Sequence, residues 1–365
     1  GLSDAGEDDT LTDTLVDMFP EQFGPKGTLP LPQVFQTTDS DSPGVRKRKN
    51  MLESAPFSII GNVVGAFIDM KGGHKTMGWM EPLDKMLASS SISLDTYIPS
   101  IVDINGKVQG TTYMLPLWHY IMGIVYRKDI IESEEFQSAY KTEFGKDWSF
   151  PDTLEDFRDV AIWAGKHTGL NGMAMAGQRI DPVVMEATNY LMSLGGDFYD
   201  RETWTSTIDS DASIKAANIY KDLIKNAAQP GALGANFDDV SNTIKQGEAV
   251  FGITYLFLWP WFQDPAESQV VDKMGFSPMP GGTPGLLGAW GWAIPSNAEN
   301  KACSWEFLEW AESKENAYKR AMLGGQPVQS WIYQDAEYIK TWPQMELALE
   351  AIKPSLGMPI MSRST

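Results

Sequence analysis

Cysteine and histidine are almost missing from this sequence, which has one cysteine and three histidines in 365 residues. A single thiol, Cys303, can form neither an intramolecular disulfide nor a thiolate cage for a metal. His74, His119 and His167 lie far apart and show no His-x-x-x-His spacing. The sequence therefore predicts neither a metal site nor a bound cofactor.

Long apolar runs are also missing. No run approaches the ~18 residues of a membrane-spanning helix, and the longest, 249–262, is interrupted by Gly252 and Pro260. The chain starts at Gly1, without a basic segment followed by an apolar one. An export signal removed earlier would leave no trace in it.

Positive charge is scarce, because 29 Lys and Arg are opposed by 48 Asp and Glu, a formal net charge of −19. Such a surface repels phosphate backbones and anionic lipids, so nucleic-acid and membrane-surface partners are not expected. The one cationic run, Arg46–Lys49, is typical of a solvated helix face.

Length and aromatic content are the positive features. A chain of 365 residues is long enough for two lobes at roughly 100–200 residues per domain. Strand patterns alternate with helix patterns, which predicts an α/β fold with a parallel sheet. Helices are expected at 11–23, 154–164, 181–194, 211–227 and 238–246 and from 301 and 314, and strands at 57–60, 120–126, 172–176, 249–254 and 290–294. The sequence opens with a loop and a helix rather than with a strand.

The 13 tryptophans and 12 tyrosines exceed what a core of this size needs, and many gather where predicted strands meet loops. The clusters are Pro116–Tyr120, Tyr255–Phe262 and Gly288–Trp292. In open α/β sheets ligands bind beyond strand ends, and an aromatic face matches the C–H face of a sugar ring. Core packing is the alternative for each tryptophan. The glycine-rich turn 280–285 lacks phosphate-loop spacing, and no G-x-S-x-G elbow occurs.

A series of short segments resembles one protein family. They are Gly78–Asp84, Asn105–Gly110, Leu115-Pro116, Ile124–Asp129, Leu194–Asp197, Gln246–Phe251, Met279–Gly282, Gly288–Ile294 and Gly324–Val328. In this order they resemble family 1 extracellular solute-binding proteins, the carbohydrate-capturing subunits of ATP-binding-cassette (ABC) importers, related to maltose-binding protein. The resemblance spans about residues 50 to 330.

The resemblance implies a two-lobed type II periplasmic-binding-protein fold with a ligand cleft and three hinge crossovers. By analogy one lobe comprises 1–109 and 272–311, and the other comprises 110–271 and 312–365. The first strand of the family fold is not found before the helix at 11–23, as if the sequence were truncated. The implied function is capture of a neutral saccharide or polyol by hinge closure. The implied partner is an ABC permease, and the implied location is periplasmic or extracellular, with anchoring to the membrane left open. The protein is expected to be a monomer and not an enzyme.

The family pattern also implies a set of ligand contacts. Trp290 is expected to stack on the ligand, and Trp118, His119 and Tyr120 stand where relatives often have Asp. The other expected contacts are Asn62, Arg179, Asp197, Tyr255, Phe257, Trp259, Gln326 and Gln329. Two alternatives stay open: a hydrolase with two carboxylates in the cleft, and a binding protein for another polar osmolyte or a glycerol phosphate.

Overall fold

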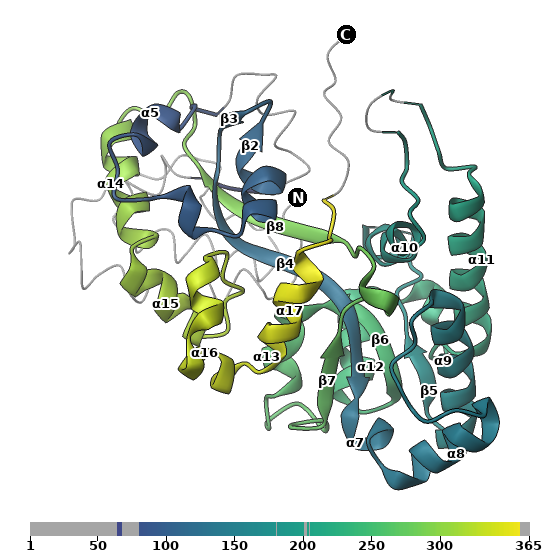
Figure 1. Ribbon diagram of the computed structural model, residues 1–365. Coiled ribbons are helices and arrows are strands. Elements are labelled where there is room, and N and C mark those ends of the chain that lie inside the picture. Colours follow the sequence, from purple (N-terminus) through teal and green to yellow (C-terminus); the bar gives the residue numbers. More distant parts are fainter. Residues whose placement is uncertain (1–63, 68–79, 180, 201–202, 204, 358–365) are drawn as a thin grey trace, which may run out of the picture. The chain divides into compact units, whose positions relative to one another are not determined.

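The computed structural model describes residues 64–67, 80–179, 181–200, 203 and 205–357 (Figure 1). The helix expected at 11–23, the strand expected at 57–60 and Asn62 lie outside these ranges. The described chain forms two compact units. Unit 1 contains 64–67, 80–119 and 289–338, and unit 2 contains 120–288 and 339–357.

The chain changes unit after His119, Gly288 and Tyr338, later in each case than the crossovers expected near 109, 272 and 312. The first two changes fall inside continuous strands, β4 (Leu115–Arg127) and β8 (Leu287–Ala293). Strand β4 thus continues from unit 1 into unit 2, and β8 continues from unit 2 into unit 1. At these two points the chain passes between the units within a strand and not within a loop.

Unit 1 contains the antiparallel pair of β1 (Val64–Phe67) and β8, with Val64 opposite Ala293 and Phe67 opposite Trp290. Helices α14 (Lys301–Ala311) and α15 (Lys314–Met322) begin where the sequence predicts them. The other described elements are α5 (Asp84–Leu87), η3 (Leu94–Thr96), α6 (Pro99–Ile101), η4 (Val102–Gly106), β2 (Lys107–Val108), β3 (Thr111–Thr112), η8 (Ser330–Gln334) and, at its boundary, α16 (Ala336–Thr341).

Unit 2 is built on a mixed sheet. Strand β5 (Asn171–Ala174) pairs in parallel with β6 (Ala249–Tyr255), whereas β4 pairs antiparallel with both β6 and β7 (Met274–Ser277). The parallel pairing predicted from the alternation of elements is confirmed for β5 and β6 and is wrong for the pairs that β4 makes with β6 and β7. Strand β4 enters from unit 1 without a helical crossover, so nothing requires it to run parallel to its neighbours.

The helices of unit 2 follow their predicted bounds closely. They are α9 (Leu154–Thr168), α10 (Asp181–Ser193), α11 (Asp211–Asn226) and α12 (Phe237–Lys245). The remaining elements are α7 (Lys128–Ile131), α8 (Glu134–Phe144), η5 (Ala232–Gly234), η6 (Leu256–Leu258), α13 (Trp259–Phe262), η7 (Pro280–Gly282) and α17 (Gln344–Ile352). Both units combine strands with helices, which confirms the α/β class.

Helix α9 shows why these predictions succeed. The Thr153 hydroxyl accepts a hydrogen bond from the Asp156 N–H, which caps the helix start. The apolar stripe at 154, 157, 160, 161 and 164 is buried. Gly169 ends the helix with a positive φ of 72°. Cap, stripe and terminator are all local features of the sequence.

Replacing Gly172 with alanine should destabilise the protein by about 1–3 kcal/mol, the usual range for overpacking. Helix α9 lies directly against β5, and a Cβ atom on Gly172 would stand 2.1 Å from the backbone oxygen of Ala161. Gly234→Ala is the matched control, because a Cβ there has no neighbour within 4 Å. Urea unfolding of both variants measures the difference, and equal stability would contradict the close approach.

Candidate functional site

In unit 2, β5 and β6 run in parallel, so their C-terminal ends lie at the same edge of the sheet. This is the edge at which open α/β sheets bind ligands. Strand β6 ends at Tyr255, and the loop after β5 leads through Arg179 into α10 at Asp181. The antiparallel β4 begins its unit 2 portion at this edge, with Met122 opposite Tyr255.

Four aromatic rings meet at this edge of unit 2. The Tyr120 ring lies 4.7 Å from Phe257 and 5.9 Å from Tyr255, measured between centroids. The Tyr255 and Phe257 rings stack at 5.2 Å and 23°, and Phe237 contacts Tyr255 at 5.3 Å. We call Tyr120, Phe237, Tyr255 and Phe257 the edge cluster. It brings together three of the residues that the sequence predicts as ligand contacts.

Exposure within the edge cluster is uneven. Tyr120 and Tyr255 are buried, whereas Phe237 and Phe257 are half-buried and present part of their rings. The Tyr255 hydroxyl lies 2.9 Å from the Met185 sulfur in the first turns of α10. This contact places the beginning of α10 beside the edge cluster. Phe237 is the first residue of α12 and follows the Asn236 cap. Apart from that cap, nothing in the sequence marks Phe237 as part of an aromatic cluster.

The remaining predicted residues of unit 2 lie around this cluster or apart from it. Arg179 is exposed in the loop between β5 and α10. Trp259 is buried at the start of α13. Asp197 is half-buried in a turn, where its carboxylate accepts a hydrogen bond from the Phe198 N–H at 2.8 Å. Asp197 therefore has a structural role in that turn.

In unit 1, His119 is a core residue. Its imidazole is fully buried, and Nε2 lies 2.7 Å from the Tyr333 hydroxyl. Burial lowers the pKa of His119 to about 3, so the ring is neutral at ordinary pH. Its backbone N–H donates to the Gln326 carbonyl at 3.2 Å. Gln326 is itself only 3% exposed.

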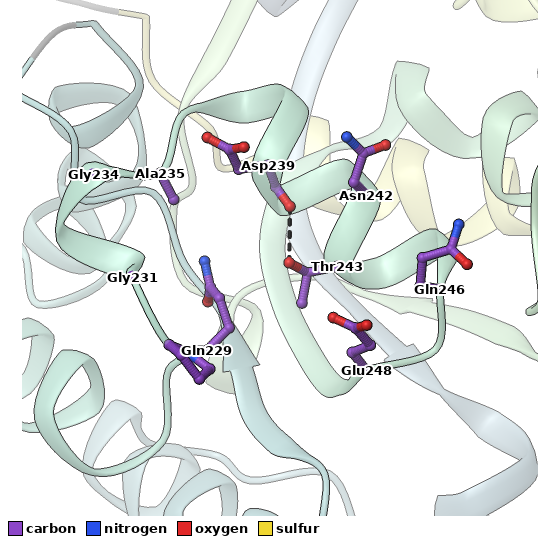
Figure 2. Close-up of a pocket in the computed structure, with 10 residues that line it drawn as sticks. Gln229, Gly231, Gly234, Ala235, Asp239, Asn242, Thr243, Gln246 and Glu248 are labelled. Atoms are coloured by element: carbon purple, nitrogen blue, oxygen red, sulfur yellow. Dashed lines mark hydrogen bonds between the residues drawn. The ribbon is translucent and has the colours of Figure 1, made fainter.

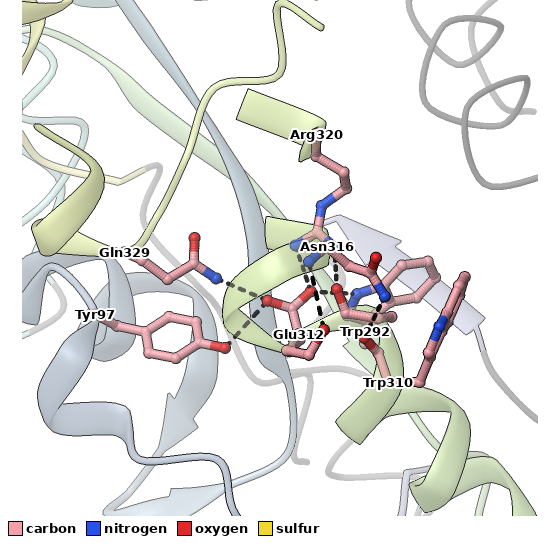
Figure 3. Close-up of polar contacts among 9 residues, drawn as sticks. Tyr97, Trp292, Trp310, Glu312, Asn316, Arg320 and Gln329 are labelled. Carbon is pink, nitrogen blue, oxygen red and sulfur yellow. Dashed lines mark hydrogen bonds and ion pairs between the residues drawn. The ribbon is translucent and has the colours of Figure 1, made fainter. Parts of the chain in front are cut away.

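Gln329 belongs to a buried network in unit 1 that is centred on the Glu312 carboxylate (Figure 3). Gln329 Nε2 donates to Glu312 at 2.8 Å, and the Tyr97 hydroxyl donates at 3.1 Å. Trp292 Nε1 and the Arg320 guanidinium donate to the other carboxylate oxygen at 2.9 and 2.8 Å. Burial, reinforced by the Glu312 charge, raises the pKa of Tyr97 well above 10.0. The Gln329 side-chain nitrogen therefore already donates a hydrogen bond inside unit 1.

Trp118 and Trp290 are both half-buried in unit 1. Trp118 lies on β4 just before the chain enters unit 2, and Trp290 lies on β8 opposite Phe67. The predicted residues are thus divided, with Trp118, His119, Trp290, Gln326 and Gln329 in unit 1 and Tyr120, Arg179, Asp197, Tyr255, Phe257 and Trp259 in unit 2.

Unit 2 also contains a pocket of about 520 Å³ that the sequence does not predict. It lies between the 229–235 segment and α12 (Figure 2). Its lining is polar and includes Asp239, Asn242, Gln246 and Glu248. None of the predicted contact residues lines it. Short polar side chains on an exposed helix face carry no distinctive sequence pattern.

A second pocket, of about 620 Å³, lies in unit 1 between α15 and η8. The Lys314 ammonium lies 5.0 Å from the centre of the Trp331 ring, and Tyr318 stacks on the same ring at 6.2 Å. The Tyr318 hydroxyl donates to Asp335 at 2.8 Å, which raises the pKa of Tyr318 to about 12. These contacts hold Trp331 against α15 in the wall of the pocket.

Within the residues that the structure describes, no group of three His, Cys, Asp or Glu side chains could hold a metal ion. None of the helices in those ranges is both long and apolar enough to cross a bilayer.

Comparison with known families decides the identity. The model of the bacterial extracellular solute-binding protein family matches residues 65–318. The chain belongs to this family. The resemblance predicted from the sequence segments is confirmed, and the segments from Gly78 to Ile294 lie inside the matched range.

Individual relatives of this solute-binding protein are distant. A probable amino-acid ABC transporter periplasmic-binding protein of Sinorhizobium fredii is 23% identical over 265 residues, which is 72% of this chain and 58% of the relative. An erythritol/L-threitol-binding protein of Mycolicibacterium smegmatis is 25% identical over 185 residues, 48% of this chain and 38% of the relative. The chain thus spans less than two thirds of either relative.

Solved structures share the fold of the solute-binding protein. Maltose-bound MalE3 of T. maritima has a TM-score of 0.76 at 22% identity and covers 99% of this chain and 88% of its own. A solute-binding protein of Agrobacterium radiobacter K84 in complex with ribitol has a TM-score of 0.69 at 22% identity, covering 81% and 75%. UgpB of Mycobacterium tuberculosis in complex with glycerophosphocholine has a TM-score of 0.70 at 18% identity, covering 98% and 86%.

Proposed function

We propose that this protein captures a neutral saccharide or polyol and delivers it to the permease of an ABC importer. The observation that carries the proposal is the edge cluster, which places half-buried aromatic rings at the ligand-binding edge of an α/β sheet in a solute-binding family member. Aromatic faces contact the C–H faces of sugars and polyols, and neighbouring polar side chains bind their hydroxyls.

Charge supports a neutral solute. The edge cluster contains no ionisable group apart from its tyrosines, and Arg179 is the one predicted contact in unit 2 with a positive charge. A doubly charged phosphate ester would need further cations beside Arg179. Relatives named for erythritol and L-threitol, or solved with ribitol or maltose, are consistent with a polyhydroxyl ligand.

The mode of action follows from the family. We infer that solute binding stabilises a closed form of the protein, and that the permease recognises this form. The protein would act in the periplasm or outside the cell, as a monomer, and would bind without catalysing a reaction. Asp197 is the one predicted contact with a carboxylate, whereas glycoside hydrolysis uses two.

A thermal-shift series with maltose, ribitol, D-mannitol and erythritol tests the proposal. A solute at 100 times its dissociation constant should stabilise the folded protein by about 2.7 kcal/mol. Glycerol phosphate, a phosphate monoester, is included to test the glycerol-phosphate alternative. The proposal fails if no sugar or polyol shifts the transition, and release of sugar from a glycoside would favour the hydrolase instead.

Replacing Phe257 with leucine should weaken binding of the solute identified in that series by about 10- to 100-fold, or about 1.4–2.8 kcal/mol. Leucine keeps an apolar side chain but removes the ring face and its stack on Tyr255. Titration calorimetry measures the loss. Trp163→Leu is the matched control in the same unit, because Trp163 packs against Phe136 and Tyr140 between α8 and α9 and is not a predicted contact. Equal losses in the two variants would remove Phe257 from the site.

A further inference from the structure

The backbone just beyond β5 is held by side chains instead of by a neighbouring strand. The Gln229 side-chain amide bonds both to the Met175 carbonyl at 2.8 Å and to the Met175 N–H at 2.9 Å. The Ala176 N–H donates to the Glu186 carboxyl at 2.7 Å, and the Tyr220 hydroxyl donates to the Ala176 carbonyl. All four polar backbone groups of these two residues are therefore satisfied by three side chains, which we call the β5 clamp.

The clamp positions the loop that carries Arg179. Gly177 lies so close to the 232–233 backbone that a Cβ atom would stand 2.5 Å from the Ala232 oxygen. The Gln178 N–H then donates to the Ala235 carbonyl at 3.0 Å. The next residue, Arg179, is exposed. The place of Arg179 at the sheet edge is thus set by the residues immediately before it.

Glu186 is the member of the clamp whose charge can change. It lies on α10, is 1% exposed and makes no ion pair in the described part of the chain. The titratable groups that face it are Tyr190 on its own helix, with the hydroxyl 3.5 Å from Oε1, and Tyr220 on α11. Burial raises the pKa of Glu186 to about 8, because no cation offsets the loss of hydration. The carboxyl is therefore neutral near pH 7.

We propose that Glu186 is a positioning residue that couples solute binding to a proton. The neutral carboxyl holds Ala176 and thereby the loop that carries Arg179. At alkaline pH the carboxyl ionises, the loop loosens and the solute binds more weakly. The inference rests on the proposed function, in which Arg179 contacts the solute.

The physical basis is the cost of a buried charge without a partner. An ionised Glu186 still accepts the Ala176 N–H, but two hydrogen bonds do not replace the hydration of a carboxylate. Hydration of the carboxylate therefore requires the loop between β5 and α10, which Glu186 holds at the Ala176 N–H, to move away from that side chain. Movement there leaves the strand and the helix intact.

Hydrogen exchange of the Ala176 amide tests the clamp without any ligand. Exchange is measured in the wild-type protein, in Glu186→Gln and in Glu143→Gln, an exposed carboxylate on α8 that serves as the control. After correction for the intrinsic rate, protection in the wild type and in the control should fall by about tenfold or more between pH 6.5 and pH 9. In Glu186→Gln it should stay constant, because the amide oxygen accepts the same hydrogen bond at every pH. The same pH dependence in all three proteins would overturn the clamp.

Affinity for maltose, ribitol and D-mannitol, each measured by calorimetry, tests the coupling. The wild type should bind its solute about fivefold more weakly at pH 9 than at pH 6.5, as for a carboxyl whose pKa is about one unit higher in the bound state. Glu186→Gln should show no such change. Arg179→Gln should bind weakly at both pH values with a flattened profile, which a merely structural role of Glu186 would not produce.

The two failures are distinguishable. If none of the three solutes binds at any pH, the coupling falls together with the proposed function, whereas the exchange result still decides the clamp. If one binds and the wild type and Glu186→Gln share the same pH profile, the coupling is overturned and the proposed function stands.

Discussion

Replacing Arg320 with methionine should destabilise unit 1 by about 3–5 kcal/mol, the cost of leaving a buried charge without its partner. The Glu312 side chain is fully buried and the Arg320 side chain is 6% exposed, and their ion pair is 2.8 Å long. Arg320 also donates to the Ala311 carbonyl. Methionine fills the space but supplies no charge and no donor. Chemical unfolding followed by tryptophan fluorescence measures the loss, because Trp292 and Trp310 lie beside the pair.

The neighbouring Lys319 provides the control. It pairs with Glu315 at 2.9 Å one turn away on the same helix, with both side chains exposed. Lys319→Met should therefore cost no more than about 0.5 kcal/mol. Adding Glu312→Gln to Arg320→Met should restore part of the lost stability, since it removes the orphaned charge. Losses of similar size in the two single variants would contradict the network as drawn.

Replacing Glu186 with glutamine should stabilise the protein at alkaline pH by on the order of 5 kcal/mol, from about 1.4 kcal/mol per pKa unit. Between the ordinary pKa of 4.5 and the native value of about 8, the unfolded chain loses the proton that the native carboxyl keeps. Stability of the wild type therefore falls as pH rises through this window. The glutamine variant carries no such proton, so its advantage grows from near zero at pH 4 to its full size at pH 9.

Unfolding curves at four or five pH values measure this difference. Glu143→Gln is again the control, because an exposed carboxylate on α8 should change neither the slope nor the stability by more than about 0.5 kcal/mol. A constant difference between wild type and Glu186→Gln from pH 4 to pH 9 would show that Glu186 releases its proton at the same pH in the native and the unfolded chain, so that burial does not raise its pKa. That result would also remove the basis for a proton-dependent loop.

Local features of the sequence predicted the helices well. Helix α9 has its cap, apolar stripe and terminal glycine within a stretch of 17 residues from Thr153 to Gly169. Helices α14 and α15 begin at the predicted residues for the same reason. Strand direction was predicted less well, because β4 owes its antiparallel pairing to residues that are more than 120 positions away in the sequence.

The candidate site was predicted in part. Tyr120, Tyr255 and Phe257 were identified as aromatic residues at strand ends, and the structure brings them together. His119 and Gln329 follow the same family positions, yet their side chains bond to Tyr333 and Glu312 in the interior of unit 1. A sequence position shows that a residue is near a strand end, but not to which side its polar atoms turn.

Part of the aromatic excess has a structural explanation. Trp148 and Trp163 pack around Phe136 and Tyr140 at centroid distances of 4.9 to 5.9 Å. His167 stacks on Trp163 at 5.0 Å and 9°. These rings form the contact between α8 and α9. The composition alone could not separate them from the rings of the edge cluster.

By itself, the sequence determined the family, the α/β class and most helix bounds, because caps, stripes and family segments are short and contiguous. Only the tertiary structure decided which polar residues are available and which are buried. Glu186 and Gln229 are ordinary polar residues in the sequence, 43 positions apart. They act together at Met175 and Ala176 because folding brings α10 and the 229–235 segment to the end of the same strand. Burial, which sets the charge state of Glu186, arises from that assembly and from no local pattern.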